Sequence, residues 1–89
     1  MAWKIKYADT VKGQLRKLDK QIARQIVEYM DDIAALEDPC SKGKALKGTL
    51  GGLWRYRVED WRVVCDIQND QVVILVLRVG HRNKVYGGH

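Results

Sequence analysis

The segment from Val72 to Val79 restricts the fold of this chain more than any other feature of its 89 residues. Apart from Arg78, its side chains are apolar at both alternating sets of positions. A strand that is apolar on both faces is typical of the centre of a sheet, where other strands lie along both of its edges. The chain therefore has to supply a neighbouring strand on each side of this segment.

Three other segments alternate between apolar and polar residues, with the period of two that a half-buried strand requires. They are residues 2–7, 54–59 and 61–68, and the last is followed by Asn69-Asp70, which indicates a hairpin turn before the central strand. The chain's tryptophans fall on the apolar sides of these segments, and we interpret them as core residues rather than as stacking platforms. They are Trp3, Trp54 and Trp61.

Between the first two strands, apolar residues recur at helical spacing and predict two helices. Asp9 or Thr10 is expected to cap the first helix, and Asp19 the second. The second helix should continue through Leu36 and end before Pro39, because the residue that precedes a proline avoids the helical region. A short connection between two helices favours an antiparallel hairpin.

These elements predict an α+β fold with the order β-α-α-β-β-β. Four strands form an antiparallel-rich sheet, the helical hairpin packs on one face, and residues 1–89 form a single domain. Residues 40–52 contain four glycines and three lysines and are predicted to form a loop with one helical turn. The other face of the sheet is expected to be open and lined by arginines.

The net charge of +5 is unevenly distributed along the chain. Residues 1–41 hold seven basic and seven acidic residues, whereas residues 42–89 hold nine basic and four acidic residues. The whole excess therefore lies in the second half. A concentrated basic surface on a small domain indicates a polyanion or an acidic protein as its partner.

Other features exclude several classes of function. The longest apolar run, Val72 to Leu77, is far too short to span a membrane, and the N-terminus shows no signal peptide. Cys40 and Cys65 lack the spacing of a metal or redox motif, and no phosphate-binding glycine loop is present. We therefore expect a cytoplasmic protein without a metal, a cofactor or a membrane partner.

Four arginines are candidates for a phosphate site: Arg55 and Arg57 on one strand, Arg62 on the next, and Arg82 just after the last. Guanidinium groups bind phosphate oxygens with two donors and stay charged at any working pH. Such a cluster suits RNA binding and the stabilisation of a pentavalent phosphorane. The alternative is a solvated sheet face in which the arginines pair with nearby carboxylates. The carboxylates available for such pairing are Glu59, Asp60 and Asp66.

His81 and Tyr86 follow the last strand as a second candidate constellation. A histidine can act as an acid or a base near neutral pH, and a tyrosine can donate a proton or stack on a base. The alternative is one surface histidine and one packing tyrosine.

Four motifs together resemble the RelE/ParE superfamily of toxins from type II toxin–antitoxin systems. They occur in the family's order and spacing, and with the helical hairpin they extend the resemblance over nearly the whole chain. The motifs are residues 44–48 (KALKG), 52–58 (GLWRYRV), 60–64 (DWRVV) and 79–86 (VGHRNKVY).

The resemblance implies a RelE-like fold and leaves two functions open. RelE-like members are mRNA interferases that enter the ribosomal A site and cut mRNA, and they need no metal. ParE-like members poison DNA gyrase and are not nucleases. Both are neutralised by an antitoxin whose acidic amphipathic segment wraps the toxin, and operator DNA is bound through the toxin–antitoxin complex. A third possibility is a catalytically inert module that only binds an antitoxin or a nucleic acid.

The resemblance also assigns roles to residues. Arg62 and Arg82 stand where RelE-like enzymes keep transition-state arginines, and Tyr86 stands at the base-stacking tyrosine. Arg55 and Arg57 stand on the strand where those enzymes can carry lysines. Arginine cannot be deprotonated in practice, so neither residue can replace a lysine as the general base.

A different residue is therefore needed to take the proton from the ribose 2′-OH. We expect His81 to do so, with Glu59 or Asp60 as the alternatives. The RNA backbone is expected to contact the two arginines of the predicted strand 54–59 and three lysines. This RNA-binding set comprises Arg55, Arg57, Lys44, Lys47 and Lys84.

Overall fold

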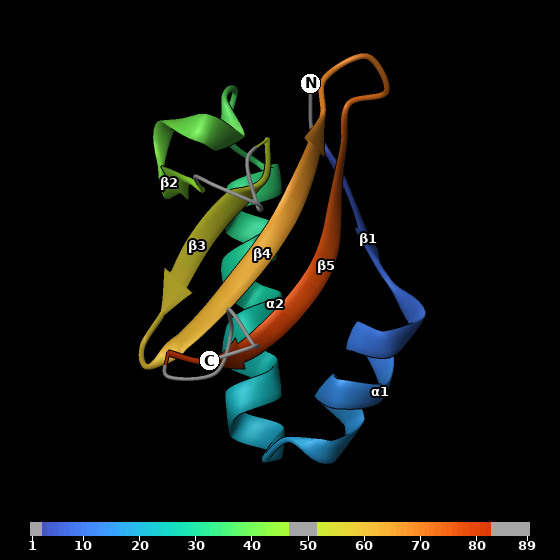
Figure 1. The fold of residues 1–89 in the computed structure, drawn as a ribbon, viewed down its shortest axis with the longest axis vertical. Coiled ribbons are helices and arrows are strands. Elements are labelled where there is room, and N and C mark those ends of the chain that lie inside the picture. Colours follow the sequence, from blue (N-terminus) through green and yellow to red (C-terminus); the bar gives the residue numbers. More distant parts are fainter. Residues whose placement is uncertain (1–2, 47–51, 83–89) are drawn as a thin grey trace.

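The computed structural model describes residues 3–46 and 52–82, which form two helices and a five-stranded sheet (Figure 1). The sheet order is β1-β5-β4-β3-β2, and only the β1–β5 pair is parallel. The predicted α+β class is thereby confirmed. The elements are β1 (Lys4–Tyr7), α1 (Asp9–Lys17), α2 (Lys20–Ala34), a 3-10 turn (Pro39–Ser41), β2 (Lys44–Ala45), β3 (Trp54–Val58), β4 (Trp61–Gln68) and β5 (Val73–His81).

Strand β5 is the central strand that the apolar segment predicts, with β1 on one side and β4 on the other. Both helices lie on one face of the sheet, as Figure 1 shows, with α1 against β5 and α2 against β1 and β3. The connection before β5 differs from the prediction. It extends to Val72, whose positive φ of 54° takes it out of the strand, and its N–H donates to the carbonyl of Asn69 at 3.3 Å.

The core fills the space between the helices and the sheet. Its buried side chains come from both layers, while the three tryptophans are half-buried at its margin, in agreement with the interpretation as core residues. No helix among the described residues is long and apolar enough to cross a membrane. The fully buried members include Val11, Ile26 and Met30 from the helices and Tyr56, Val63, Cys65, Ile74 and Val76 from the sheet.

The N-terminal capping residue agrees with the sequence prediction for one helix and differs from it for the other. Asp19 caps α2 by accepting a hydrogen bond from the Gln21 N–H at 2.8 Å, as predicted. Helix α1 instead begins after Ala8, and neither Asp9 nor Thr10 is its cap. The Ala8 N–H donates to the Val76 carbonyl at 2.9 Å, so sheet pairing holds the chain until the residue before the helix starts.

The segment after α2 contains a strand that the sequence did not predict. Instead of a loop over residues 40–52, the structure has the 3-10 turn and then β2, which pairs with Trp54 and Arg55. Side chains from β3 tie this segment to the sheet. The Trp54 indole N–H donates to the Lys42 carbonyl at 2.7 Å, and the buried Tyr56 hydroxyl donates to the Pro39 carbonyl at 2.8 Å.

Gly43 allows β2 to approach β3 this closely. Its φ of +81° favours glycine, and a Cβ there would lie 2.5 Å from the Arg55 carbonyl oxygen. We expect Gly43→Ala to lower the free energy of unfolding by about 2 kcal/mol or more, measured by urea titration. Gly13→Ala is the matched control, because α1 leaves open space there. That change should stabilise the protein by about 0.5–1 kcal/mol, and equal effects of the two substitutions would contradict the argument.

Candidate functional site: a basic face beside the β3–β4 turn

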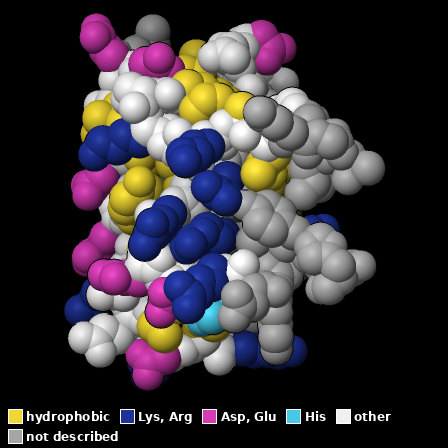
Figure 2. Space-filling model, turned by 60° about the vertical axis from the view of Figure 1, so that its left-hand side comes forward, with side chains coloured by type: hydrophobic (Ala, Val, Ile, Leu, Met, Phe, Trp, Pro, Cys, Tyr) yellow, Lys and Arg dark blue, Asp and Glu magenta, His cyan; other side chains and the backbone are white. Residues whose placement is uncertain are grey.

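Strands β3 and β4 bring three of the predicted arginines onto the face opposite the helices. Arg57 is the register partner of Arg62, and Arg55 is the partner of Val64. The residues that alternate with them, such as Tyr56 and Val63, point into the core. Figure 2 shows Lys and Arg side chains gathered in one run over this side of the molecule, with acidic side chains at its margin.

The pair Arg57–Arg62 places two like charges directly opposite each other. The Arg55 carbonyl faces Gly43, next to β2. Backbone N–H and C=O groups of residues two apart in a strand point to the same edge, so those of Arg57 also point away from β4. The Arg57–Arg62 pair is therefore of the non-hydrogen-bonded kind, in which side chains approach most closely. Like charges in this position destabilise a sheet unless an anion lies between them. The arrangement thus favours an anionic ligand.

The β3–β4 turn holds both of the predicted transition-state arginines. Arg62 folds back over the turn, and its Nη1 donates to the carbonyls of Glu59 and Trp61 at 3.0 and 3.1 Å. Arg82 lies at the end of β5, where its backbone N–H donates to the Asp60 carbonyl at 2.8 Å. Its side-chain Nη1 also lies 3.9 Å from the Asp60 carboxylate.

These contacts orient the two guanidinium groups without using all of their donors. A guanidinium carries five N–H donors, and within the described ranges Arg62 uses only those of Nη1. The Arg82–Asp60 pair is largely exposed, with 57% and 66% of the side chains accessible, so its attraction is weak. A phosphate with two available oxygens can therefore compete for both arginines.

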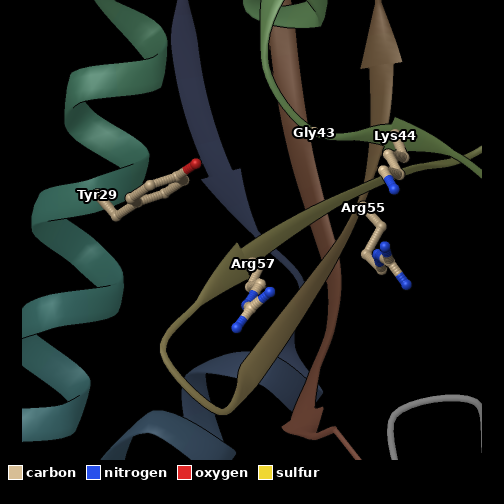
Figure 3. Close-up of a pocket in the computed structure, with 5 residues that line it drawn as sticks. All are labelled: Tyr29, Gly43, Lys44, Arg55 and Arg57. Atoms are coloured by element: carbon tan, nitrogen blue, oxygen red, sulfur yellow. The ribbon is translucent and has the colours of Figure 1, made fainter.

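A pocket of about 200 Å³ lies at the outer edge of β3, as Figure 3 shows. Its lining combines three cations, Lys44, Arg55 and Arg57, with Gly43 and with Tyr29 from α2. Lys44 and Arg55 are cross-strand partners, so their side chains lie next to each other. The pocket thus extends the basic face around the sheet edge.

Tyr29 is a residue that the sequence analysis did not select. Its ring contacts Tyr56 edge to face, with a centroid separation of 6.2 Å. Burial raises the pKa of the Tyr29 hydroxyl above its ordinary value of 10.0, so the hydroxyl is protonated and able to donate to an anion at neutral pH. Only an aromatic residue within an otherwise aliphatic helix stripe marked this position in the sequence.

Arg78 on β5 is a second residue that the sequence analysis did not select. Regular alternation from Ile74 and Val76 would direct its side chain toward the helices. However, the β4–β5 register changes between Val64 and Cys65, whose partners are Arg78 and Val76, so Leu77 is an extra residue in β5. This bulge turns the exposed Arg78 onto the basic face and returns Val79 to the core.

His81 lies on the other face of the sheet from Arg62. It is the register partner of Trp61, and their rings meet edge to face with centroids 5.8 Å apart. Trp61 packs against the core, on the same face as Val63. The register thus assigns His81 and Arg62 to opposite faces of the strands, while the histidine side chain visible in Figure 2 borders the end of the run of Lys and Arg side chains. Tyr86, Lys47 and Lys84 fall outside the described residues.

The cysteine thiols offer no evident nucleophile. Burial raises the pKa of Cys65 far above its ordinary value, and burial together with Asp38 raises that of Cys40. Both are therefore protonated at neutral pH, and a thiol is a poor nucleophile. Within residues 3–46 and 52–82, no group of His, Cys, Asp and Glu side chains is arranged to hold a metal ion.

Comparison with known proteins places this chain and its fold in a family. The sequence model of the family described as "ParE toxin of type II toxin-antitoxin system, parDE" matches residues 5–86. Toxin RelG of Mycobacterium tuberculosis is 28% identical over 87 residues, which are 97% of this chain and 98% of RelG.

Solved structures show the same relationship. The toxin–antitoxin complex RelBE2 of M. tuberculosis contains a chain with a TM-score of 0.82 and 26% identity, and the match covers 92% of this chain and 100% of that one. The archaeal RelE–RelB complex of Pyrococcus horikoshii contains one with a TM-score of 0.75 and 28% identity, covering 96% and 100%. The family match spans most of the residues from β1 onward, and the fold agrees. The chain therefore belongs to the RelE/ParE superfamily of type II toxin–antitoxin toxins.

Proposed function

We propose that this toxin is a ribosome-dependent mRNA endonuclease, acting in the cytoplasm. The observation that supports the proposal best is the meeting of Arg57, Arg62 and Arg82 beside one turn. Arg57 faces Arg62 across the strands, and the same turn holds Arg62 and Arg82. Three cations beside one turn suit a phosphate that gains negative charge during reaction.

The proposed reaction needs only the RNA's own 2′-OH as nucleophile. Its oxygen forms a bond to the adjacent phosphorus while the bond from phosphorus to the 5′-oxygen breaks. The products are a 2′,3′-cyclic phosphate and a 5′-OH, with the proton of the 2′-OH removed and another delivered to the leaving oxygen. The arginines stabilise the pentavalent phosphorane through charge-assisted hydrogen bonds.

A cognate antitoxin is the second expected partner. The similar chains of M. tuberculosis and P. horikoshii were both solved in toxin–antitoxin or RelE–RelB complexes. The net charge of +5 and the basic face favour an acidic amphipathic segment that covers the arginines. In this proposal, operator DNA is bound only through the toxin–antitoxin complex.

A gyrase-directed toxin without nuclease activity is the alternative, and the family match to the ParE toxin description favours it. The two functions predict different damage. Expression of the full chain should yield mRNA cut within translated codons, as detected by primer extension, if the endonuclease proposal is correct. Intact ribosome-bound mRNA together with failed DNA supercoiling would establish the alternative instead.

The position of His81 leads to a prediction about proton transfer. Because its ring packs edge to face on Trp61, whose side chain lies on the face of the strands opposite Arg62, we expect His81→Gln to leave the pH profile of cleavage unchanged between about pH 5 and 8. The cleavage rate itself should change by less than about threefold. If the wild-type cleavage rate depends on pH in this range and His81→Gln abolishes that dependence, His81 is the general base.

A further inference from the structure

We infer that Arg78 and Arg55 form a phosphate-binding row of their own beside the row of Arg57 and Arg62, so that the basic face holds two successive phosphates of a single-stranded RNA. The inference deepens the proposed endonuclease function and rests on it for the identity of the ligand. It names Arg78 as a positioning residue, which holds the substrate beside the reacting phosphate.

The bulge in β5 is the first observation. An extra residue interrupts the ladder of hydrogen bonds and is a recurrent means of redirecting a side chain near a functional site. Here the extra residue is Leu77, and the side chain that changes face is Arg78. Without the bulge, an arginine would point into a core that contains Ile74, Val76 and Val79.

The register then arranges the basic face in two rows that cross the strands. In the first row, Arg55 and Arg78 lie on either side of Val64. In the second row, Arg57 and Gly80 lie on either side of Arg62. The rows are two residues apart along each regular strand, which corresponds to roughly 6.8 Å. Neighbouring phosphates of an extended RNA strand have a similar separation.

Gly80 is the member of the second row that has no side chain. A glycine within a strand often marks a place where a ligand approaches the backbone closely. Gly80 presents only backbone opposite Arg62, near the end of β5, where the Arg82 N–H donates to the Asp60 carbonyl of the turn. The reacting phosphate fits this second row, and the neighbouring phosphate then meets Arg55 and Arg78 in the first.

This assignment separates binding from chemistry. The second row acts on the charge that develops in the transition state. Arg78 binds a phosphate whose charge does not change, so it stabilises the ground state and the transition state equally. Its removal should raise KM and leave kcat unchanged.

The test compares Arg78→Ala with wild type in the binding of a short oligouridine at increasing salt. Each phosphate contact contributes about 0.7 to the slope of log K against log salt for a single strand. We expect Arg78→Ala to reduce the slope by about that amount and to weaken binding about tenfold at low salt. Arg24→Ala, an exposed arginine on α2, is the matched control and should change neither quantity.

Two further measurements keep the inference falsifiable. Arg78→Lys retains the charge and should keep the wild-type slope, whereas a misfolded variant would lose binding together with its urea transition. On programmed ribosomes, Arg78→Ala should raise KM about tenfold with kcat within about twofold of wild type. A wild-type slope in Arg78→Ala, or a loss confined to kcat, would overturn the inference. A reduced slope in a protein that never cuts mRNA would overturn the endonuclease proposal and leave the phosphate-binding role of Arg55 and Arg78 standing.

Discussion

Arg62→Ala and Arg82→Ala are each expected to lower the rate of mRNA cleavage on ribosomes by about 10²-fold or more. Each removes a cation that the β3–β4 turn holds where the proposed function places the reacting phosphate. The size of the effect is that of losing one preorganised donor to a developing negative charge. The measurement is single-turnover cleavage of a translated mRNA, with the expressed variant's effect on growth as a second readout.

The two variants differ in what else they change. Arg62 also donates to two turn carbonyls, so its removal can loosen the turn, and Arg62→Lys is needed to separate charge from geometry. Within residues 3–46 and 52–82, the Arg82 side chain makes only a long, exposed ion pair with Asp60, whose loss costs at most about 1 kcal/mol. Arg82→Ala is therefore the cleaner test. Arg16→Ala, on the exposed surface of α1, should cleave at the wild-type rate.

The sheet and its basic face were predictable wherever strands follow the period of two. Alternation alone placed Arg55 and Arg57 opposite the buried Tyr56, and Arg62 opposite the buried Val63. The apolar segment before Gly80 likewise indicated the central position of β5. These predictions depend only on the local alternation of side chains between the two faces, which every residue of a regular strand follows.

The errors arose where tertiary contacts override the local pattern. The β5 bulge reverses the face of Arg78, and no residue type in the segment predicts a bulge there. Strand β2 exists because Trp54 and Tyr56 bind carbonyls far away in the chain and Gly43 permits the close approach. The role expected of His81 stays a prediction: its ring packs on Trp61, while its neighbour in the motif, Arg82, is bound to the turn.

Arg57→Glu is expected to change stability and activity in opposite directions. In the wild type, Arg57 faces Arg62 across the strands, and the repulsion between them lowers the stability of the free protein. A glutamate there would pair with Arg62 and raise the free energy of unfolding by about 0.5 kcal/mol at low salt. It would also direct an anion at the phosphate, so cleavage should fall by about 10³-fold or more.

Arg24→Glu makes the same change of net charge on the outer surface of α2 and serves as the control. It should keep wild-type cleavage and lower stability slightly, because Glu28 lies one helical turn away. Urea titrations at low and high salt test whether the effect is electrostatic, since screening should remove most of the increase in the free energy of unfolding caused by Arg57→Glu. A destabilised Arg57→Glu that still cuts mRNA would show that this face serves the fold rather than the phosphate. A stabilised but inactive variant would show that the wild type holds two mutually repelling cations at the position where an anion binds.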